Sequence, residues 1–108
     1  MTELREPTYL SMVALSREPL HGYGIIQEVR RLSRGRTDLK AATIYALLDR
    51  LESTGLVQVD REEIVDGRLR RYYGLTKEGT AVLAQESLQR SATSKEALRR
   101  LRISGAIA

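Results

Sequence analysis

The spacing of hydrophobic residues predicts three helices in the first half of the chain. In 7–17, apolar side chains fall at i, i+3 and i+4, and the proline at its start suits a first helical turn. A second helix opens at 21–24, and its apolar stripe ends before a polar loop at 33–38. The clearest amphipathic pattern lies in 41–54, where the stripe is Ile44, Leu47, Leu48 and Leu51.

After Gly55, a predicted C-cap, the hydrophobic period changes from 3.6 to 2. The alternation over 56–75, with Asp66-Gly67 between its halves, predicts a β-hairpin, because both turn residues tolerate positive φ. Thr76 is then a suitable N-cap for a fourth helix. Its stripe is imperfect, so we expect 91–94 to weaken or break it and the tail 104–108 to fray.

Three helices, a hairpin and a final helix are the element order of a winged helix-turn-helix. The expected fold is mainly α with a β-hairpin wing (α+β), in which two helices brace a third that enters the DNA major groove. We assign 1–75 to the DNA-binding domain and 76–108 to a C-terminal dimerisation helix and tail. The two form one compact unit.

Composition narrows the class of protein further. The chain has 108 residues, no cysteine and no long apolar run, which predicts a cytoplasmic protein without disulfides or membrane spans. Its core would be aliphatic with a few tyrosines, since tryptophan and phenylalanine are absent. Such a core is thin for this length, and the fourth helix has little left to pack against. We therefore expect a homodimer.

Positive charge is concentrated in two segments. Residues 30–40 and 90–102 each carry a net charge of +4, whereas the rest of the chain carries −4. Localised positive charge attracts a polyanion. From the charge alone, a solvated surface without a nucleic-acid partner is an equally good interpretation of these segments.

Candidate DNA contacts lie on the predicted third helix and the wing. Small side chains on the outer face of that helix allow close approach to the bases, and a tyrosine hydroxyl or basic side chain can contact phosphate. The predicted contacts are Lys40, Ala42, Thr43, Tyr45, Arg50, Arg68, Arg70 and Arg71.

Several of these candidates have a structural alternative. Tyr45 can instead pack at the edge of the core. Arg71 shares a strand face with apolar residues and can lie over them, which makes Arg70 the better wing candidate. Asp49 and Glu52 are expected to form local ion pairs.

Catalytic and metal sites are not expected. His21 is the single histidine, and its place in the turn before the second helix predicts a hydrogen-bonded structural role. Any Ser/His/Asp triad would have to be built around this one histidine. The chain has no GxxxxGK phosphate-binding loop, and one histidine without any cysteine leaves no plausible transition-metal cluster. We therefore predict neither an enzyme nor a cofactor.

Three motifs carry a resemblance to a known family. HGYGI at 21–25 resembles the HGYxI motif of PadR-family transcriptional regulators. ATIYALLDRLESTGLV at 42–57 resembles the recognition helix of that family, and RRYYGLTKEG at 70–79 is similar to the end of its wing. The motifs follow in the right order over about 10–83.

The resemblance implies a homodimeric DNA-binding repressor that dimerises through its C-terminal helix. It places Thr43, Tyr45, Arg70 and Arg71 against DNA. Three residues depart from the family pattern: Ala42 replaces a glycine, Lys40 replaces a small capping residue, and Gly74 replaces a larger residue before the leucine. Since lysine cannot cap, the helix is expected to begin earlier, at 37 or 38.

Two-fold symmetry would require a pseudo-palindromic operator with half-sites about one helical turn apart. Without tryptophan or phenylalanine to stack planar drugs, an aromatic-drug sensor is not expected, and the effector stays open. The alternative function is a winged-helix protein–protein adaptor that does not bind DNA. The predicted dimerisation residues are Val82, Leu83, Leu88, Leu98 and Leu101.

Overall fold

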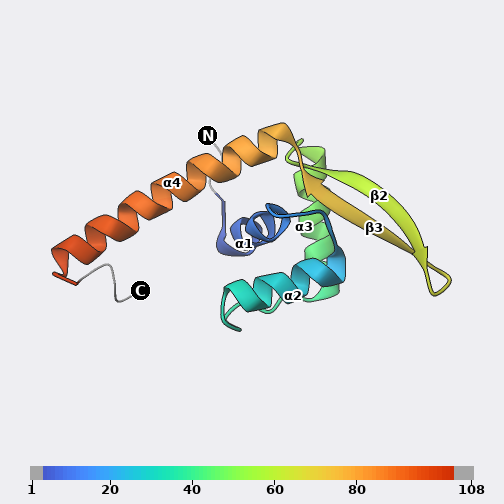
Figure 1. Ribbon diagram of the computed structural model, residues 1–108, viewed down its shortest axis with the longest axis horizontal. Helices are drawn as coiled ribbons and strands as arrows, with labels where there is room; N and C mark the ends of the chain where they lie inside the picture. The colour runs from blue at the N-terminus through green and yellow to red at the C-terminus, as the bar shows by residue number, and fades with distance from the viewer. Residues whose placement is uncertain (1–3, 104–108) are drawn as a thin grey trace.

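The computed structural model describes residues 4–103 and confirms the α+β winged-helix fold. The predicted fraying of 104–108 lies outside the described residues. The elements are α1 (Glu6–Leu15), β1 (Leu20–His21), α2 (Gly22–Leu32), α3 (Ala41–Ser53), β2 (Val57–Val65), β3 (Arg68–Leu75) and α4 (Lys77–Arg100). Figure 1 shows the first three helices packed together, with the β2–β3 hairpin on one side and α4 crossing above α1.

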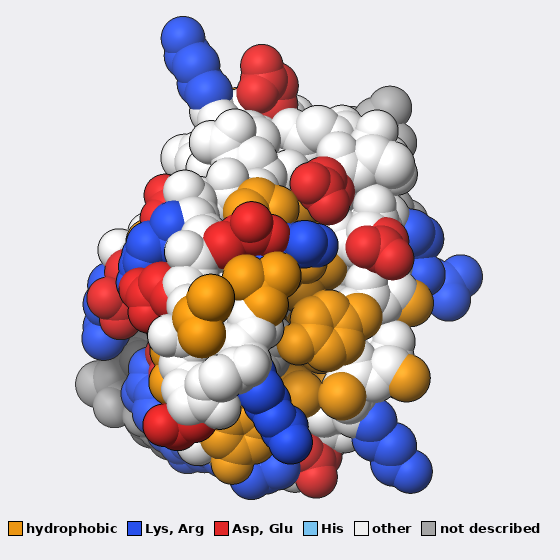
Figure 2. Space-filling model, turned by 90° about the vertical axis from the view of Figure 1, so that its right-hand side faces the viewer, with side chains coloured by type: hydrophobic (Ala, Val, Ile, Leu, Met, Phe, Trp, Pro, Cys, Tyr) orange, Lys and Arg blue, Asp and Glu red, His pale blue; other side chains and the backbone are white. Residues whose placement is uncertain are grey.

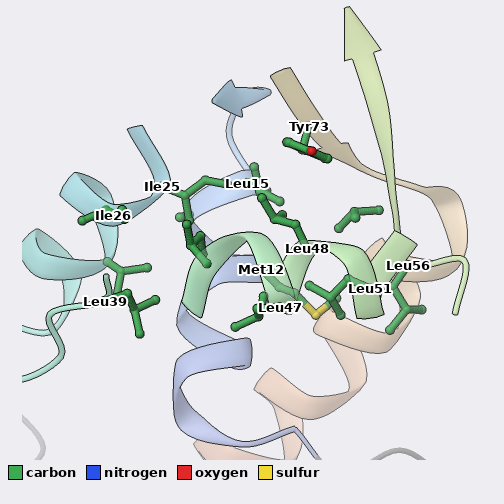
Figure 3. Packing of buried hydrophobic residues seen from close by; sticks show 14 of the residues in the cluster. Met12, Leu15, Ile25, Ile26, Leu39, Leu47, Leu48, Leu51, Leu56 and Tyr73 are labelled. Atoms are coloured by element: carbon green, nitrogen blue, oxygen red, sulfur yellow. The ribbon is translucent and has the colours of Figure 1, made fainter. Parts of the chain in front are cut away.

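The core lies where α1, α2 and α3 meet the base of the sheet. All four residues of the α3 stripe are buried, as the pattern predicts, and they pack around Met12 and Ile25 (Figure 3). Tyr73 of β3 covers one side of this cluster and Leu56 another. Helix α3 is therefore anchored to the core by its inner face.

The sheet has three strands rather than the two of the predicted hairpin. Its order is β1-β3-β2, and the two residues of β1 pair antiparallel with Tyr72 and Tyr73. A strand of two residues is too short to show an alternating pattern, which is why the sequence did not reveal it. The predicted turn is confirmed, since Asp66 and Gly67 have φ of 51° and 76°.

Helix α4 continues unbroken through 91–94, contrary to the expected break. The hydroxyl of Thr93 donates to the Gln89 carbonyl at 3.0 Å, which keeps a threonine compatible with the helix interior. One turn later, Glu96 pairs with both Arg99 and Arg100. The second half of α4 projects away from the other elements in Figure 1.

The first half of α4 is bound to α1. Leu83 is buried in the core, and the Tyr9 and Ser87 hydroxyls lie 2.9 Å apart. The Arg90 guanidinium lies 3.8 Å from the centre of the Tyr9 ring and pairs with Glu6 at 2.5 Å. Much of the basic segment 90–102 is thus engaged in contacts within the chain.

Thr76 joins α4 to the end of α3. Its hydroxyl donates to the Gly55 carbonyl at 2.6 Å and accepts from the Gly79 N–H at 2.9 Å, so it caps α4 as predicted. Gly79 lies so close to β2 that an added Cβ would overlap the Leu56 carbonyl oxygen. This junction fixes where the wing leaves the helical core.

Candidate nucleic-acid interface

The outward face of α3 carries a row of short side chains. Ala42, Ala46, Asp49 and Ser53 fall at i, i+4, i+7 and i+11, opposite the buried stripe, and all four are exposed. Nothing bulky separates the helix axis from a ligand on this side. The row therefore has the shape that close approach to base edges requires.

The start of α3 differs from the expectation that it begins at 37 or 38. The helix begins at Ala41, and Lys40 takes the N-cap position without a side-chain cap. Contacts other than a side-chain cap hold the preceding loop. Asp38 pairs with Arg30 at 2.8 Å, and Leu39 is buried in the core. These contacts hold the loop extended until Lys40, whose side chain is exposed beside the helix N-terminus.

Tyr45 lies on the side of α3 that faces α2 and the wing. Half of its side chain is exposed, at 50%, so it belongs to the surface rather than to the core. Its ring rests on Gly22, where an ideal Cβ would approach the Tyr45 hydroxyl to 2.8 Å. The glycine of the HGYG motif thus leaves room for the tyrosine, a relationship that spacing did not reveal.

A groove runs between α3 and the wing. Tyr45 and Asp49 line it from α3, whereas Arg68 and Arg70 line it from β3. Figure 2 looks onto the wing end of the molecule, where basic, acidic and apolar side chains are intermixed. The structure thus brings Tyr45 and the wing arginines Arg68, Arg70 and Arg71 to one groove. The other predicted residues at and near α3 do not line it; these are Lys40, Ala42, Thr43 and Arg50.

The wing arginines differ in how they are engaged. Arg71 donates to Glu62 across the strand pair at 2.8 Å, and this hydrogen bond raises the pKa of Arg71 above its usual range. It therefore pairs with a carboxylate instead of lying over apolar surface. Within residues 4–103, no carboxylate lies within salt-bridge distance of Arg68 or Arg70.

Thr43 and Arg50 lie on the opposite flank of the outward row, spaced i and i+7, and both are exposed. Arg50 lines a separate hollow beside Arg5 and Thr8 at the start of α1. The predicted DNA contacts on α3 therefore occupy both flanks of the row, with Tyr45 on the wing side.

His21 has the structural role that its position predicts. Its Nδ1 accepts from the Gly24 N–H at 3.2 Å, which caps α2, and its ring meets the Tyr72 ring edge-on at 5.4 Å between centroids. Burial, and secondarily the charge of Arg70, lower the pKa of His21. The lowered pKa favours the neutral imidazole, which is the form that can accept this hydrogen bond through Nδ1.

The prediction that Asp49 and Glu52 form local ion pairs was wrong. Both side chains are exposed, and in the part of the chain that the structure describes neither has a basic partner within salt-bridge distance. The reason lies in α3 itself: no lysine or arginine stands three or four residues from either carboxylate. Arg50, between them, points to another side.

The predicted dimerisation residues are distributed unevenly. Val82 and Leu83 pack against the core of their own chain, so Leu83 is not available to a partner. Leu88 and Leu101 are exposed at 73% and 66%, and Leu98 is half-buried. Among the predicted dimerisation residues, the chain itself therefore leaves Leu88, Leu98 and Leu101 at least partly exposed.

Within residues 4–103, no three side chains among histidine, aspartate and glutamate lie close enough together to hold a metal ion. None of the helices in this part of the chain combines the length and the hydropathy that a membrane span requires.

The order of elements, the exposed row on α3 and the hairpin beside it define a winged helix-turn-helix protein. Residues 11–85 match the model of the transcriptional regulator PadR-like family. The chain belongs to this family, which confirms the class of protein that the three motifs indicate.

Individual relatives agree with this assignment. The transcriptional regulator Rv3488 of Mycobacterium tuberculosis is 37% identical over 79 residues, which cover 73% of this chain and 70% of that protein. A protein of Lysinibacillus sphaericus is 34% identical over 65 residues, and the match spans 60% of each chain.

Solved structures show the same fold. A PadR family transcription regulator from Clostridium difficile R20291 superposes with a TM-score of 0.72 at 28% identity, covering 90% of this chain and 98% of that one. The structure of Bacillus subtilis PadR in complex with operator DNA superposes with a TM-score of 0.67 at 24% identity, covering 75% of this chain and 46% of that one.

Proposed function

We propose that the protein is a sequence-specific DNA-binding transcriptional regulator that acts as a homodimeric repressor in the cytoplasm. The observation that carries this proposal is the exposed row of short side chains on α3, beside a groove that Tyr45 lines together with Arg68 and Arg70, two arginines without a salt-bridge partner among the described residues. The operator complex of Bacillus subtilis PadR supports the same mode of action for a protein of this fold.

In this proposal α3 lies in the major groove and the wing beside it. The row from Ala42 to Ser53 approaches the base edges, and small side chains permit contact with the thymine methyl group. The Tyr45 hydroxyl and the guanidinium groups of Arg68 and Arg70 contact phosphates, which position the protein without selecting a sequence. Lys40 and the exposed N–H groups at the start of α3 favour a further phosphate.

Dimerisation is proposed through the second half of α4. Leu83, Ser87 and Arg90 face α1 at i, i+4 and i+7, and the same row continues with Ser94, Leu98 and Leu101 beyond the body of the chain. A second copy would extend the packing that α1 provides to the first half. Leu88 lies about 140° round the helix axis from Leu101 and is peripheral to such a contact.

Two-fold symmetry then sets the form of the operator. Two α3 helices related by this axis require a pseudo-palindromic site with half-sites about one helical turn apart. An effector that binds the dimer would act by changing the distance between the two helices, and its chemistry stays open.

A protein–protein adaptor is the second candidate, and the wing gives a reason to consider it. Ile64 and Leu69 face each other across the strand pair and are 76% and 62% exposed. Residues 57–75 hold four basic and four acidic side chains, so the wing as a whole is neutral. A neutral wing with an apolar pair would also suit a protein surface.

The test is selection of bound fragments from genomic DNA, followed by titration of the purified protein with the enriched duplex at several salt concentrations. If the protein is a DNA-binding regulator, the logarithm of its binding constant falls linearly with the logarithm of the salt concentration, and Tyr45→Phe and Arg70→Ala bind more weakly. The adaptor predicts no salt-dependent binding. Unchanged affinity in both variants at matched salt would remove these residues from the interface.

A further inference from the structure

Asp49 is the one charged member of the outward row of α3. Its neighbours in the row, Ala42, Ala46 and Ser53, have short side chains, so the carboxylate stands clear of the surface around it. It also lines the groove that Arg68 and Arg70 line from the wing. A negative charge thus lies on the α3 side of a groove whose wing side carries Arg68, Arg70 and Asp66.

Nothing in the fold accounts for an aspartate at this position. The side chain is exposed, and within the described residues it makes neither an ion pair nor a side-chain hydrogen bond. Aspartate is a poor helix former in a helix interior, and it is too far from the α3 N-terminus to stabilise the helix dipole. A structural role would favour alanine, which stands at the two preceding positions of the row.

A carboxylate on a DNA-binding face can favour some base pairs over others. Phosphates repel it, so it weakens binding to DNA in general. In the major groove it can only accept hydrogen bonds, and the donors there are the N4 amino group of cytosine and the N6 amino group of adenine. Of these, cytosine N4 is the partner that a carboxylate matches, whereas adenine N6 and N7 together match a carboxamide.

We propose that Asp49 is a specificity-determining residue that accepts a hydrogen bond from the N4 amino group of one cytosine in each half-site. This inference rests on the proposed function. The short neighbours let a side chain with a single methylene reach a base edge. Arg68 and Arg70, across the groove, supply the phosphate contacts that offset the repulsion of Asp49.

The experiment is selection of bound duplexes from a pool with a randomised central region, with the full-length protein at fixed salt. The wild type, Asp49→Ala, Asp49→Asn and Glu52→Gln are compared. Glu52 is a matched control, because it is an exposed carboxylate on the same helix but lies outside the row. Circular dichroism establishes that each variant keeps its helices.

The wild type is expected to enrich a cytosine at one position of each half-site. Asp49→Ala loses the preference at that position alone, with discrimination among the four bases falling by about 5- to 150-fold. Its affinity for unrelated duplex DNA rises, because a repulsive charge is gone. Asp49→Asn shifts the preference at the same position from cytosine to adenine, and Glu52→Gln leaves the motif unchanged.

The outcomes separate this inference from the function on which it rests. A wild type that enriches no motif overturns both. A wild-type motif that Asp49→Ala leaves unchanged overturns the role of Asp49 alone, as does a loss at every position, which would indicate a positioning role.

Discussion

The Tyr45 ring lies directly on Gly22, so a residue of the recognition helix is positioned by the first residue of α2. An ideal Cβ on Gly22 would lie 2.8 Å from the Tyr45 hydroxyl oxygen and 2.9 Å from Cζ. The Gly22→Ala substitution therefore displaces the ring while leaving the buried core intact. We expect this variant to bind operator DNA about tenfold more weakly, through loss of one hydrogen bond to phosphate.

A double-mutant cycle tests this coupling. In a Tyr45→Ala background, Gly22→Ala should have no further effect on affinity, because no ring remains to be displaced. Gly24→Ala is the control, since its Cβ would meet Leu20 at an ordinary 3.6 Å. Additive effects of the two substitutions would show that Gly22 does not act through Tyr45.

Gly79 allows the start of α4 to lie close to the chain before the wing. The Gly79→Ala substitution places a methyl group on the Leu56 carbonyl oxygen, which belongs to the backbone and cannot rotate away. We expect the free energy of unfolding to fall by about 1–3 kcal/mol or more, measured by urea denaturation. Gly74→Ala, whose Cβ would lie 3.6 Å from Pro19, should leave stability nearly unchanged. Equal stability of the two variants would contradict the close approach of Gly79 to the Leu56 backbone.

Protonation of His21 should destabilise the fold. Partial burial and then Arg70 lower its pKa from 6.5, so the unfolded chain takes up this proton at a higher pH than the folded chain does. The contribution to stability is therefore complete above pH 6.5 and is lost as the pH falls through the folded pKa.

His21→Asn supplies the comparison for this pH dependence. Asparagine keeps an acceptor for the Gly24 N–H but does not titrate. Urea denaturation of both proteins between about pH 5 and pH 7.5 should show a steeper loss of stability for the wild type. Parallel pH profiles would exclude His21 as the titrating group.

Replacement of an apolar residue on the projecting half of α4 should weaken the dimer. Leu98→Glu introduces a charge into the row that a second copy would cover, so we expect the dimer dissociation constant to rise by about tenfold or more. Sedimentation equilibrium at micromolar concentration measures it. Gln89→Glu adds the same charge on another side of α4 and should not change the association. A monomeric wild type would contradict the proposed dimer.

The helical core and the hairpin could be predicted because each follows from a local period. The stripe of α3 has 3.6-residue spacing, and all four of its members are buried. The Asp66-Gly67 turn has the positive φ angles that its sequence predicts. Patterns of this kind report which face of an element is buried, and the core then assembles from those faces.

Features that depend on contacts between distant segments were missed or misplaced. Strand β1 exists through its pairing with β3, and the start of α3 is set by the burial of Leu39. The expectation that Leu83 faces a partner does not account for its burial in the core of its own chain, a contact between distant segments. The expected break in α4 was wrong for a local reason, because the Thr93 hydroxyl bonds to the Gln89 carbonyl within an unbroken helix. The contact of the Tyr45 ring with Gly22 likewise connects α3 with α2, whereas each sequence motif covers only one of these helices.

The proposed dimer places its two α3 helices in adjacent major grooves of one operator. Protection of guanine N7 from dimethyl sulfate reports contact in the major groove directly, because N7 is exposed there. We expect two protected segments centred about one helical turn apart, at roughly 10 base pairs. We expect both to be lost in Leu98→Glu at concentrations where that variant is monomeric. Bound DNA with no protected N7, or with a single protected segment for the dimer, would contradict this arrangement.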